Sequence, residues 1–149
     1  MSDIDDAISR LQAIALQCSI PSAGPASTSL KAAPAYPIED ATALPMAIAC
    51  LTSGTASPDN ASTARILPTV RVDFHFSRVS LKNAYTQADA VAQEYSQRLC
   101  GDPTLNGTVS TIVFPVNFTV SPAQWDKITT QMLSFTIPLK LLKTPTAST

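Results

Sequence analysis

Residues 80–109 read SLKNAYTQADAVAQEYSQRLCGDPTLNGTV, a pattern typical of one long helix, an abrupt stop and a turn. Apolar side chains recur there at three- and four-residue steps, so they form one stripe along a helix, and polar side chains fill the other side. Such a helix spans roughly 30 Å, about the width of a small domain, so we expect it to cover a whole sheet. The stripe consists of Leu81, Ala84, Ala88, Val91, Ala92, Tyr95 and Leu99.

The end of this helix is encoded by residues that favour turns. Gly101 stands where a helix commonly ends in a left-handed residue, and Pro103 prevents the helix from continuing. Asn106 and Gly107 are typical of a second turn. We therefore expect Gly101, Asp102, Pro103, Asn106 and Gly107 to form a structural turn, and loss of Asp102 or of the Asn-Gly pair to destabilise the fold.

Before residue 44, the sequence predicts a second helix and then a long irregular segment. The helix is capped by Ser2 or Asp3 and runs to about Cys18, because apolar residues again recur at helical spacing. Small, polar and proline-bearing residues follow, so we expect a mobile connector over 22–29 and an extended segment over 30–38. Together they predict a flexible arm over about 20–40.

Two strands separated by a loop are expected next. Residues 44–51 form a short apolar run typical of a buried strand, and 53–63 are expected to be a flexible loop. Residues 64–77 alternate clearly, which predicts a strand with one face in the core and the other in water or in an interface. The core face carries Val70, Val72, Phe74 and Phe76, and the polar face carries Thr69, Arg71, Asp73, His75 and Ser77.

The last third of the chain alternates twice more, over 108–120 and 130–143. The link over 121–126 is too short for a crossover, so the two segments are expected to form an antiparallel hairpin with a turn there. Pro115 and Pro138 each remove a backbone donor, which predicts bulges or one-sided pairing. Inward positions are Ile112, Phe114, Val116, Phe118, Val120, Leu133, Phe135, Ile137, Leu139 and Leu141.

These elements predict an α+β fold in the order α-β-β-α-β-β, with two helices packed on a mostly antiparallel sheet of four to five strands. The chain of 149 residues has the size of one domain, 1–149, with the arm, the loop and a mobile tail over 144–149. Charged residues make up 14% and the net charge is -1, which argues against a basic nucleic-acid-binding face. With 45% apolar residues, this composition favours an oligomer.

The sequence contains few candidates for chemistry. Asp73 and His75 have the Asp-x-His spacing that places two potential metal ligands on one side of a strand, but nothing indicates further ligands. The pair is better interpreted as part of an exposed or interfacial polar row. Nucleotide-binding glycine motifs and GxSxG are absent, so we expect no enzyme activity, no cofactor and no metal. The three cysteines are expected to be buried, reduced thiols, and no apolar run is long enough to span a membrane.

Residues 99–109, LCGDPTLNGTV, following a long helix, resemble the tail terminator (tail completion) proteins of long-tailed bacteriophages, in which this helix ends in an Asp-Pro-Thr-Leu-x-Gly-Thr-Val-like turn. The N-terminal helix, Ala35-Tyr36-Pro37, Leu44-Pro45 and the strand over 69–74 fit the same element order. The resemblance implies a non-enzymatic virion protein, assembled in the host cytoplasm, that forms a hexameric ring at the head-proximal end of the tail.

The resemblance also implies partners. They are further copies of the chain, the tail tube protein and the head–tail connector or stopper protein, with genomic DNA passing through the lumen without sequence-specific binding. Candidate subunit or partner contacts are Arg65, Arg71, Asp73 and Arg78, because arginine is enriched at interfaces. Alternatives are another phage neck or head–tail joining protein, a ferredoxin-like ligand-binding module with a pocket between helix and sheet, and a hydrolase that uses His75.

Overall fold

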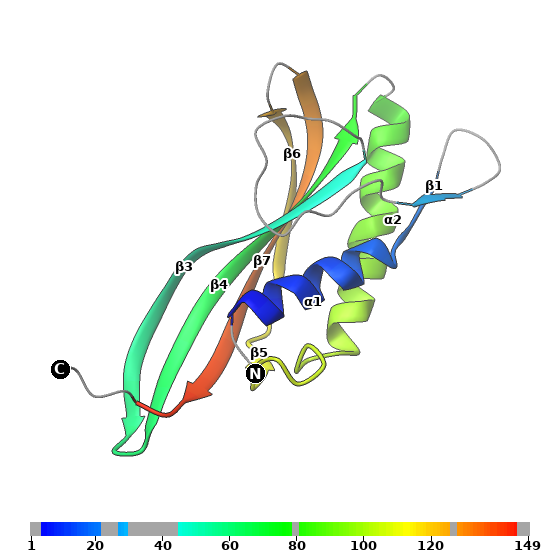
Figure 1. The fold of residues 1–149 in the computed structure, drawn as a ribbon. Helices are drawn as coiled ribbons and strands as arrows, with labels where there is room; N and C mark the ends of the chain where they lie inside the picture. The colour runs from blue at the N-terminus through cyan, green and yellow to red at the C-terminus, as the bar shows by residue number, and fades with distance from the viewer. Residues whose placement is uncertain (1–3, 22–26, 30–44, 79–80, 126–127, 146–149) are drawn as a thin grey trace.

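The computed structural model describes residues 4–21, 27–29, 45–78, 81–125 and 128–145 (Figure 1). Within these ranges it has the expected α+β architecture, with two helices, a five-stranded antiparallel sheet and a separate pair of short strands. In chain order the elements are α1 (Ile4–Leu16), β1 (Ser19–Pro21), β2 (Ser27–Ser29), β3 (Met46–Asn60), β4 (Thr63–Ser77), α2 (Leu81–Cys100), β5 (Thr111–Ile112), β6 (Asn117–Trp125) and β7 (Ile128–Lys143).

Both helices lie on one face of the sheet and share a single hydrophobic cluster with it. Helix α2 follows its predicted stripe closely, since every stripe residue except Leu81 is buried. The ring of Tyr95 packs edge-on against Phe74 and Phe135, with centroid distances of 5.0 and 4.9 Å. Its hydroxyl donates a 3.0 Å hydrogen bond to the carbonyl of Leu11 on α1. One side chain therefore connects α2 to both the sheet and α1.

Strand β7 lies in the middle of the sheet, whose order is β3-β4-β7 with β5 and β6 sharing the far edge. Its register with β4 pairs Val70 with Ile137 and Phe74 with Leu133, so the apolar sides of both strands face the helices. The predicted inner face of β4 is fully buried. A buried large apolar side chain contributes about 1.5–3 kcal/mol, so this two-layer core dominates the stability of the fold.

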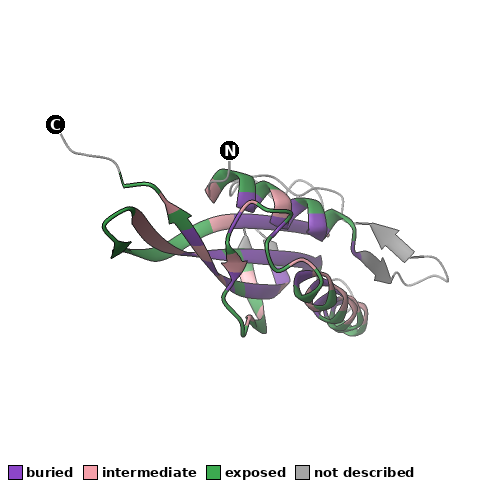
Figure 2. Cartoon of the chain, turned by 90° about the horizontal axis from the view of Figure 1, so that it is seen from below, coloured by how far each residue is buried: buried purple, intermediate pink, exposed green. Residues whose placement is uncertain are grey.

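Residues 53–60 are not a loop, as the sequence predicted, but the second half of β3. They pair with β4 from Ser53 opposite Thr69 to Asn60 opposite Thr63, with register shifts near residues 51–53 and 58–60. The resulting hairpin extends beyond the helices, and its exposed residues form one end of the molecule (Figures 1 and 2). Pro58 is compatible with this strand because β3 lies at the edge of the sheet, where one row of donors faces no further strand in the described part of the chain.

The predicted connector over 22–29 is also partly wrong. Residues 27–29 form β2, which pairs with β1 in an antiparallel two-stranded sheet, and β1 lies against α2. Backbone pairing with a neighbouring segment explains this outcome, since the side chains alone carry no strand pattern. The predicted cap at Ser2 or Asp3, the segment over 30–38 and residues 146–149 lie outside the described residues. Thr144 and Pro145 are exposed.

The C-terminal hairpin is confirmed as antiparallel, but its boundaries differ. The predicted strand over 108–120 is divided into β5 and β6, and Pro115 lies between them. The predicted turn over 121–126 is wrong, because 117–125 all belong to β6 and β7 begins at 128. Phe114, Phe118 and Val120 were expected to point inward, yet their exposed fractions are 43, 48 and 39%. Among the described residues, the helices pack on β3, β4 and β7 and make no extensive contact with β6, which leaves Phe118 and Val120 uncovered.

Candidate functional site

The turn after α2 is built differently from the prediction at Gly101. Its amide still donates to the carbonyl of Gln97 in helical fashion, at 3.1 Å, and its backbone is not left-handed. The left-handed conformation comes later, at Leu105, Asn106 and Gly107, with φ angles of 49, 58 and 81°. Gly101 therefore belongs to the last turn of the helix. Gly107 is the glycine at which the backbone needs a positive φ, which glycine adopts without steric cost.

Asp102 connects this turn to the rest of the protein. Its Oδ2 accepts a 2.9 Å bond from Nε of Arg10 on α1, and its Oδ1 accepts a 2.9 Å bond from the amide of Asn106. The carbonyl of Pro103 accepts a hydrogen bond from the amide of Ile112 in β5, at 2.6 Å. These bonds fix the turn against α1 on one side and the sheet on the other, which gives the predicted structural role a geometric basis.

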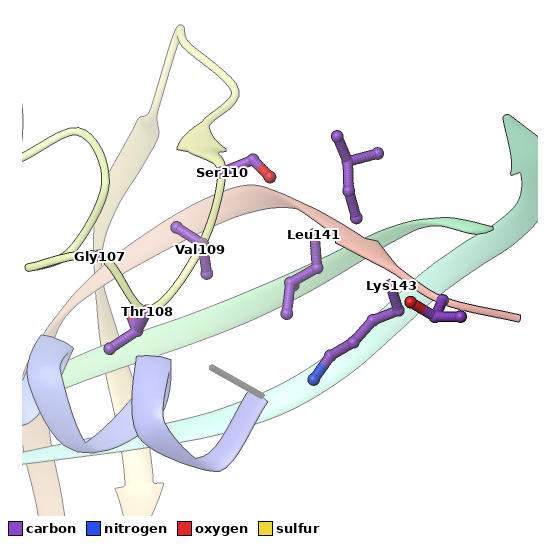
Figure 3. A pocket seen from close by; sticks show the side chains of 8 residues that line it. Gly107, Thr108, Val109, Ser110, Leu141 and Lys143 are labelled. Atoms are coloured by element: carbon purple, nitrogen blue, oxygen red, sulfur yellow. The ribbon is translucent and has the colours of Figure 1, made fainter. Parts of the chain in front are cut away.

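A hollow of about 390 Å³ lies beside the turn (Figure 3). It is lined by residues 107–110 after the turn and by residues 141–144 at the end of β7. Lys143 is the one ionisable side chain among these lining residues. An acid–base pair for catalysis needs a second titratable group within reach, and this lining supplies none.

Asp73 and His75 were expected on a wet or interfacial face, but both are buried, with exposed fractions of 7 and 6%. Asp73 Oδ2 accepts a 2.9 Å bond from Nε of Arg71, and its Oδ1 has no hydrogen-bond partner among the described residues. Nδ1 of His75 lies 2.7 Å from Oγ1 of Thr130. The prediction of an exposed or interfacial row is therefore wrong for Asp73 and His75, whereas Arg71 and Ser77 on the same face are exposed.

Burial also sets the protonation of the groups that a hydrolase would need. Desolvation lowers the pKa of His75, against the opposing influence of Asp73, so the neutral ring is favoured. Burial raises the pKa of the Cys18 thiol to about 12, which leaves almost no thiolate at neutral pH. The expectation that all three cysteines are buried is wrong, because Cys50 is half-buried and Cys100 is exposed.

The four predicted contact residues do not form one cluster. Arg65 and Arg71 lie on the same face of β4, whereas Arg78 follows the other end of the strand, roughly 40 Å from Arg65 along an extended chain. The Arg71 side chain is 50% exposed although its Nε holds Asp73. The Nε atoms of Arg65 and Arg78 are buried without a hydrogen-bond partner among the described residues.

Two observations bear on the remaining possibilities, a metal site and a ligand pocket between helix and sheet. In the described part of the chain, no three His, Cys, Asp or Glu side chains lie together in a way that could hold a metal ion. The space between α2 and the sheet, where a ligand-binding module would need a pocket, is filled by Phe74, Tyr95 and Phe135, all fully buried.

The surface that sequence reasoning missed is the extended hairpin, which we call the ribbon and define as residues 51–67. Residues 51–62 are all exposed, and Asp59 is the one charged residue among them. One signal was present in the sequence: Gly54 packs so close to β4 that a Cβ would lie 3.1 Å from the carbonyl oxygen of Leu67. A glycine inside a strand often marks such a close backbone approach.

No protein-family model matches the chain, and no curated protein matches it either. In the part of the chain that the structure describes, neither helix combines the length and the apolar character that a membrane span requires.

Proposed function

We propose that this chain is a structural virion protein that forms a ring, a homohexamer, at the head-proximal end of a long phage tail. There it ends polymerisation of the tail tube and joins the tail to the head connector. The proposal rests on the resemblance of residues 99–109 to the turn of tail terminator proteins. The hydrogen bonds of Asp102 give that segment a defined shape and attach it to α1, and the carbonyl of Pro103 attaches it to β5.

Within the structure, the single observation that carries the proposal is the ribbon. This hairpin extends past the core and exposes twelve consecutive residues, 51–62, with a single charge. Open, uncharged strand edges tend to pair with other chains unless they are covered. A ring built head to tail covers such surfaces in every subunit and leaves two faces for different partners, here the tail tube protein and the connector or stopper protein.

In this role the chain needs no catalytic residue, cofactor or metal. Genomic DNA crosses the lumen of the ring, and a net charge of -1 fits a surface that does not bind it tightly. Arg78 and Arg65 remain candidate contacts with neighbouring subunits. Arg71 is a less clean probe, because its removal would leave the buried Asp73 carboxylate without its cation.

Electron microscopy of particles made by the virus that encodes this chain is the direct test. We expect a ring of this protein between the last layer of tail tube and the connector. We also expect a virus that lacks the chain to produce tails of irregular length that do not join heads. Density elsewhere in the neck would favour the alternative of a different head–tail joining protein, and absence from the particle would contradict both.

A further inference from the structure

The turn after α2 contains the one Asn-Gly pair of the sequence, Asn106-Gly107, and both residues are exposed. An asparagine followed by glycine can lose its side-chain amide spontaneously, because glycine has no Cβ that would crowd the attack of its nitrogen. The space beside Gly107 is open, since a Cβ placed there would meet nothing within 4 Å. The pair therefore supplies the reacting atoms and gives water access to them.

The reaction joins two atoms of this pair. The Gly107 nitrogen gives up its proton and attacks Cγ of Asn106, the Cγ–Nδ2 bond breaks, and the side-chain nitrogen leaves with that proton as ammonia. The product is a five-membered succinimide ring. Water then opens the ring at one of its two carbonyl carbons. Attack at Cγ gives an aspartate with the original main chain, and attack at the main-chain carbonyl carbon gives an isoaspartate, whose main chain runs through Cβ and Cγ.

The folded turn holds the reacting atoms apart. To close the ring, Cβ of Asn106 and the nitrogen of Gly107 must lie on the same side of the Asn106 Cα–C bond. Asn106 has a φ of 58°. For an L-residue this φ belongs to the left-handed region, where ψ is about +30 to +60°. At such ψ values the two atoms lie nearly opposite each other across that bond, so the ring cannot close.

Hydrogen bonds on both sides of the pair maintain this conformation. The amide of Asn106 donates to Oδ1 of Asp102 at 2.9 Å. The amide of Gly107 donates to the carbonyl of Thr104 at 3.0 Å, so the attacking nitrogen is itself engaged. Oδ2 of Asp102 accepts a 2.9 Å bond from Nε of Arg10 on α1. The turn can therefore open only when these bonds break, and α1 takes part through Arg10.

We propose that Asn106 is a protected modification site, which converts to aspartate or isoaspartate when the turn opens and is preserved while the turn is closed. The inference goes beyond the proposed function and does not depend on ring formation. It assigns a second role to the bonds of Asp102, which stabilise the turn and also keep the Asn-Gly pair from reacting.

Conversion to isoaspartate should leave a lasting mark on the chain. The amides of Gly107 and Val109 both donate to the carbonyl of Thr104, at 3.0 and 3.2 Å. An isoaspartate at position 106 adds one atom to the main chain between this acceptor and both donors. The two bonds then no longer fit together, so the turn does not close again in its original form. The aspartate product keeps the main chain, and Asp tolerates the left-handed conformation as Asn does.

Peptide mapping by mass spectrometry tests the inference on the full chain. The parent protein is kept in mildly alkaline buffer, either folded or unfolded in guanidinium chloride, and digested at intervals. We expect conversion of Asn106 to be at least about tenfold slower in the folded protein, because a turn held by several bonds is open for only a small part of the time. Asn60 is exposed and precedes an alanine, so it serves as the internal reference and should convert more slowly than Asn106 in guanidinium chloride.

Substitutions that weaken the turn should accelerate the reaction in the folded protein. Asp102→Ala removes the acceptor of the Asn106 amide, and we expect conversion about tenfold faster, since a hydrogen bond to a charged group is lost. Arg10→Gln leaves that acceptor in place and should give a smaller increase, which also provides a test if Asp102→Ala does not fold. Asp89→Ala is the matched control, because it removes the same charge from an exposed position on α2.

Three results would overturn the inference. Equal rates in the folded and unfolded parent protein would show that the turn gives no protection. Absence of conversion at Asn106 in guanidinium chloride would show that the pair is not a modification site. Rates for Asp102→Ala and Arg10→Gln that match Asp89→Ala would show that these bonds do not control the opening.

Hydrogen exchange tests the lasting mark separately. The isoaspartate form is isolated by ion exchange after conversion and refolding, and Asn106→Asp serves as its control because it carries the same charge on an unchanged main chain. Amides of residues 107–109 should exchange faster in the isoaspartate form than in Asn106→Asp. Equal protection in the two proteins would contradict a turn that stays open after conversion.

Discussion

Tyr95 is the residue at which the two helices and the sheet meet, so its hydroxyl and ring can be tested separately. Replacing Tyr95 by Phe removes the bond to the Leu11 carbonyl and keeps the ring contacts. We expect a loss of about 1 kcal/mol in the free energy of unfolding, measured by urea titration. Tyr85→Phe is the matched control and should change nothing, since Tyr85 is 51% exposed. Equal effects of the two substitutions would contradict a specific role for the buried hydroxyl.

Two glycines close to each other are expected to respond oppositely to alanine. Gly107 has a φ of +81°, and the space that a Cβ would occupy there is open, so Gly107→Ala introduces only backbone strain. The expected cost is about 1–2 kcal/mol in the free energy of unfolding. At Gly101 the backbone is helical and a Cβ meets nothing closer than 3.5 Å, so Gly101→Ala should be neutral or slightly stabilising. Thermal unfolding should give a lower midpoint temperature for Gly107→Ala than for Gly101→Ala. The opposite ranking would contradict this assignment of the two glycines.

His75 gives the protein a pH dependence whose sign follows from its burial. Because burial lowers the pKa of His75 below its ordinary value of 6.5, the unfolded chain binds this proton more readily than the folded chain. Stability therefore falls as the pH drops below 6.5, and the group contributes no pH dependence well above it. Between about pH 7 and pH 5, the urea midpoint of His75→Gln should change less with pH than the midpoint of the parent chain. Equal slopes for the two proteins would show that the ring is not desolvated.

At the scale of elements, the ribbon and the core hairpin should differ in local stability. Residues 53–60 pair with β4 alone and are exposed, whereas residues 70–76 pair on both sides and are largely buried. Amides in the first set should exchange with solvent through local opening, and those in the second mainly through global unfolding. Native-state hydrogen exchange followed by mass spectrometry compares the two sets. Uniform protection across the hairpin would contradict an independently opening ribbon.

The same elements show how much the sequence could predict. Helix α2 and the inner face of β4 can be predicted from local periodicity, because each packs one face against the same core and its apolar residues recur at the period of that face. Residues 53–60 carry no such pattern, and their strand structure comes from backbone pairing with β4, which local sequence does not encode. The wrong predictions that Asp73 is exposed and that Phe118 is buried have the same origin. Alternation assigns a residue to a face of the sheet, but the neighbouring elements decide how much of that face is covered.

At the scale of the whole molecule, the low charge bears on which force would hold copies together in the proposed ring. Only 14% of the residues are charged, and none of the residues that line the shallow groove at the base of the ribbon, among them Leu67, Val113 and Pro138, carries a charge. Association through this groove would depend on apolar burial, which added salt does not screen. Ion pairs at a surface, in contrast, weaken when the Debye length falls from about 10 Å toward 3 Å. The two kinds of contact can therefore be separated by ionic strength.

We expect assembly of the chain, followed by native mass spectrometry after exchange or by light scattering, to persist or strengthen as NaCl rises from about 0.1 to 1 M. Val113→Glu should abolish assembly at every salt concentration, because it places a charge in the groove. Arg78→Gln serves as the comparison, because it removes a candidate ionic contact at a distance from the groove. Dissociation by salt, together with loss of assembly in Arg78→Gln and not in Val113→Glu, would place ion pairs rather than the apolar surfaces between the subunits.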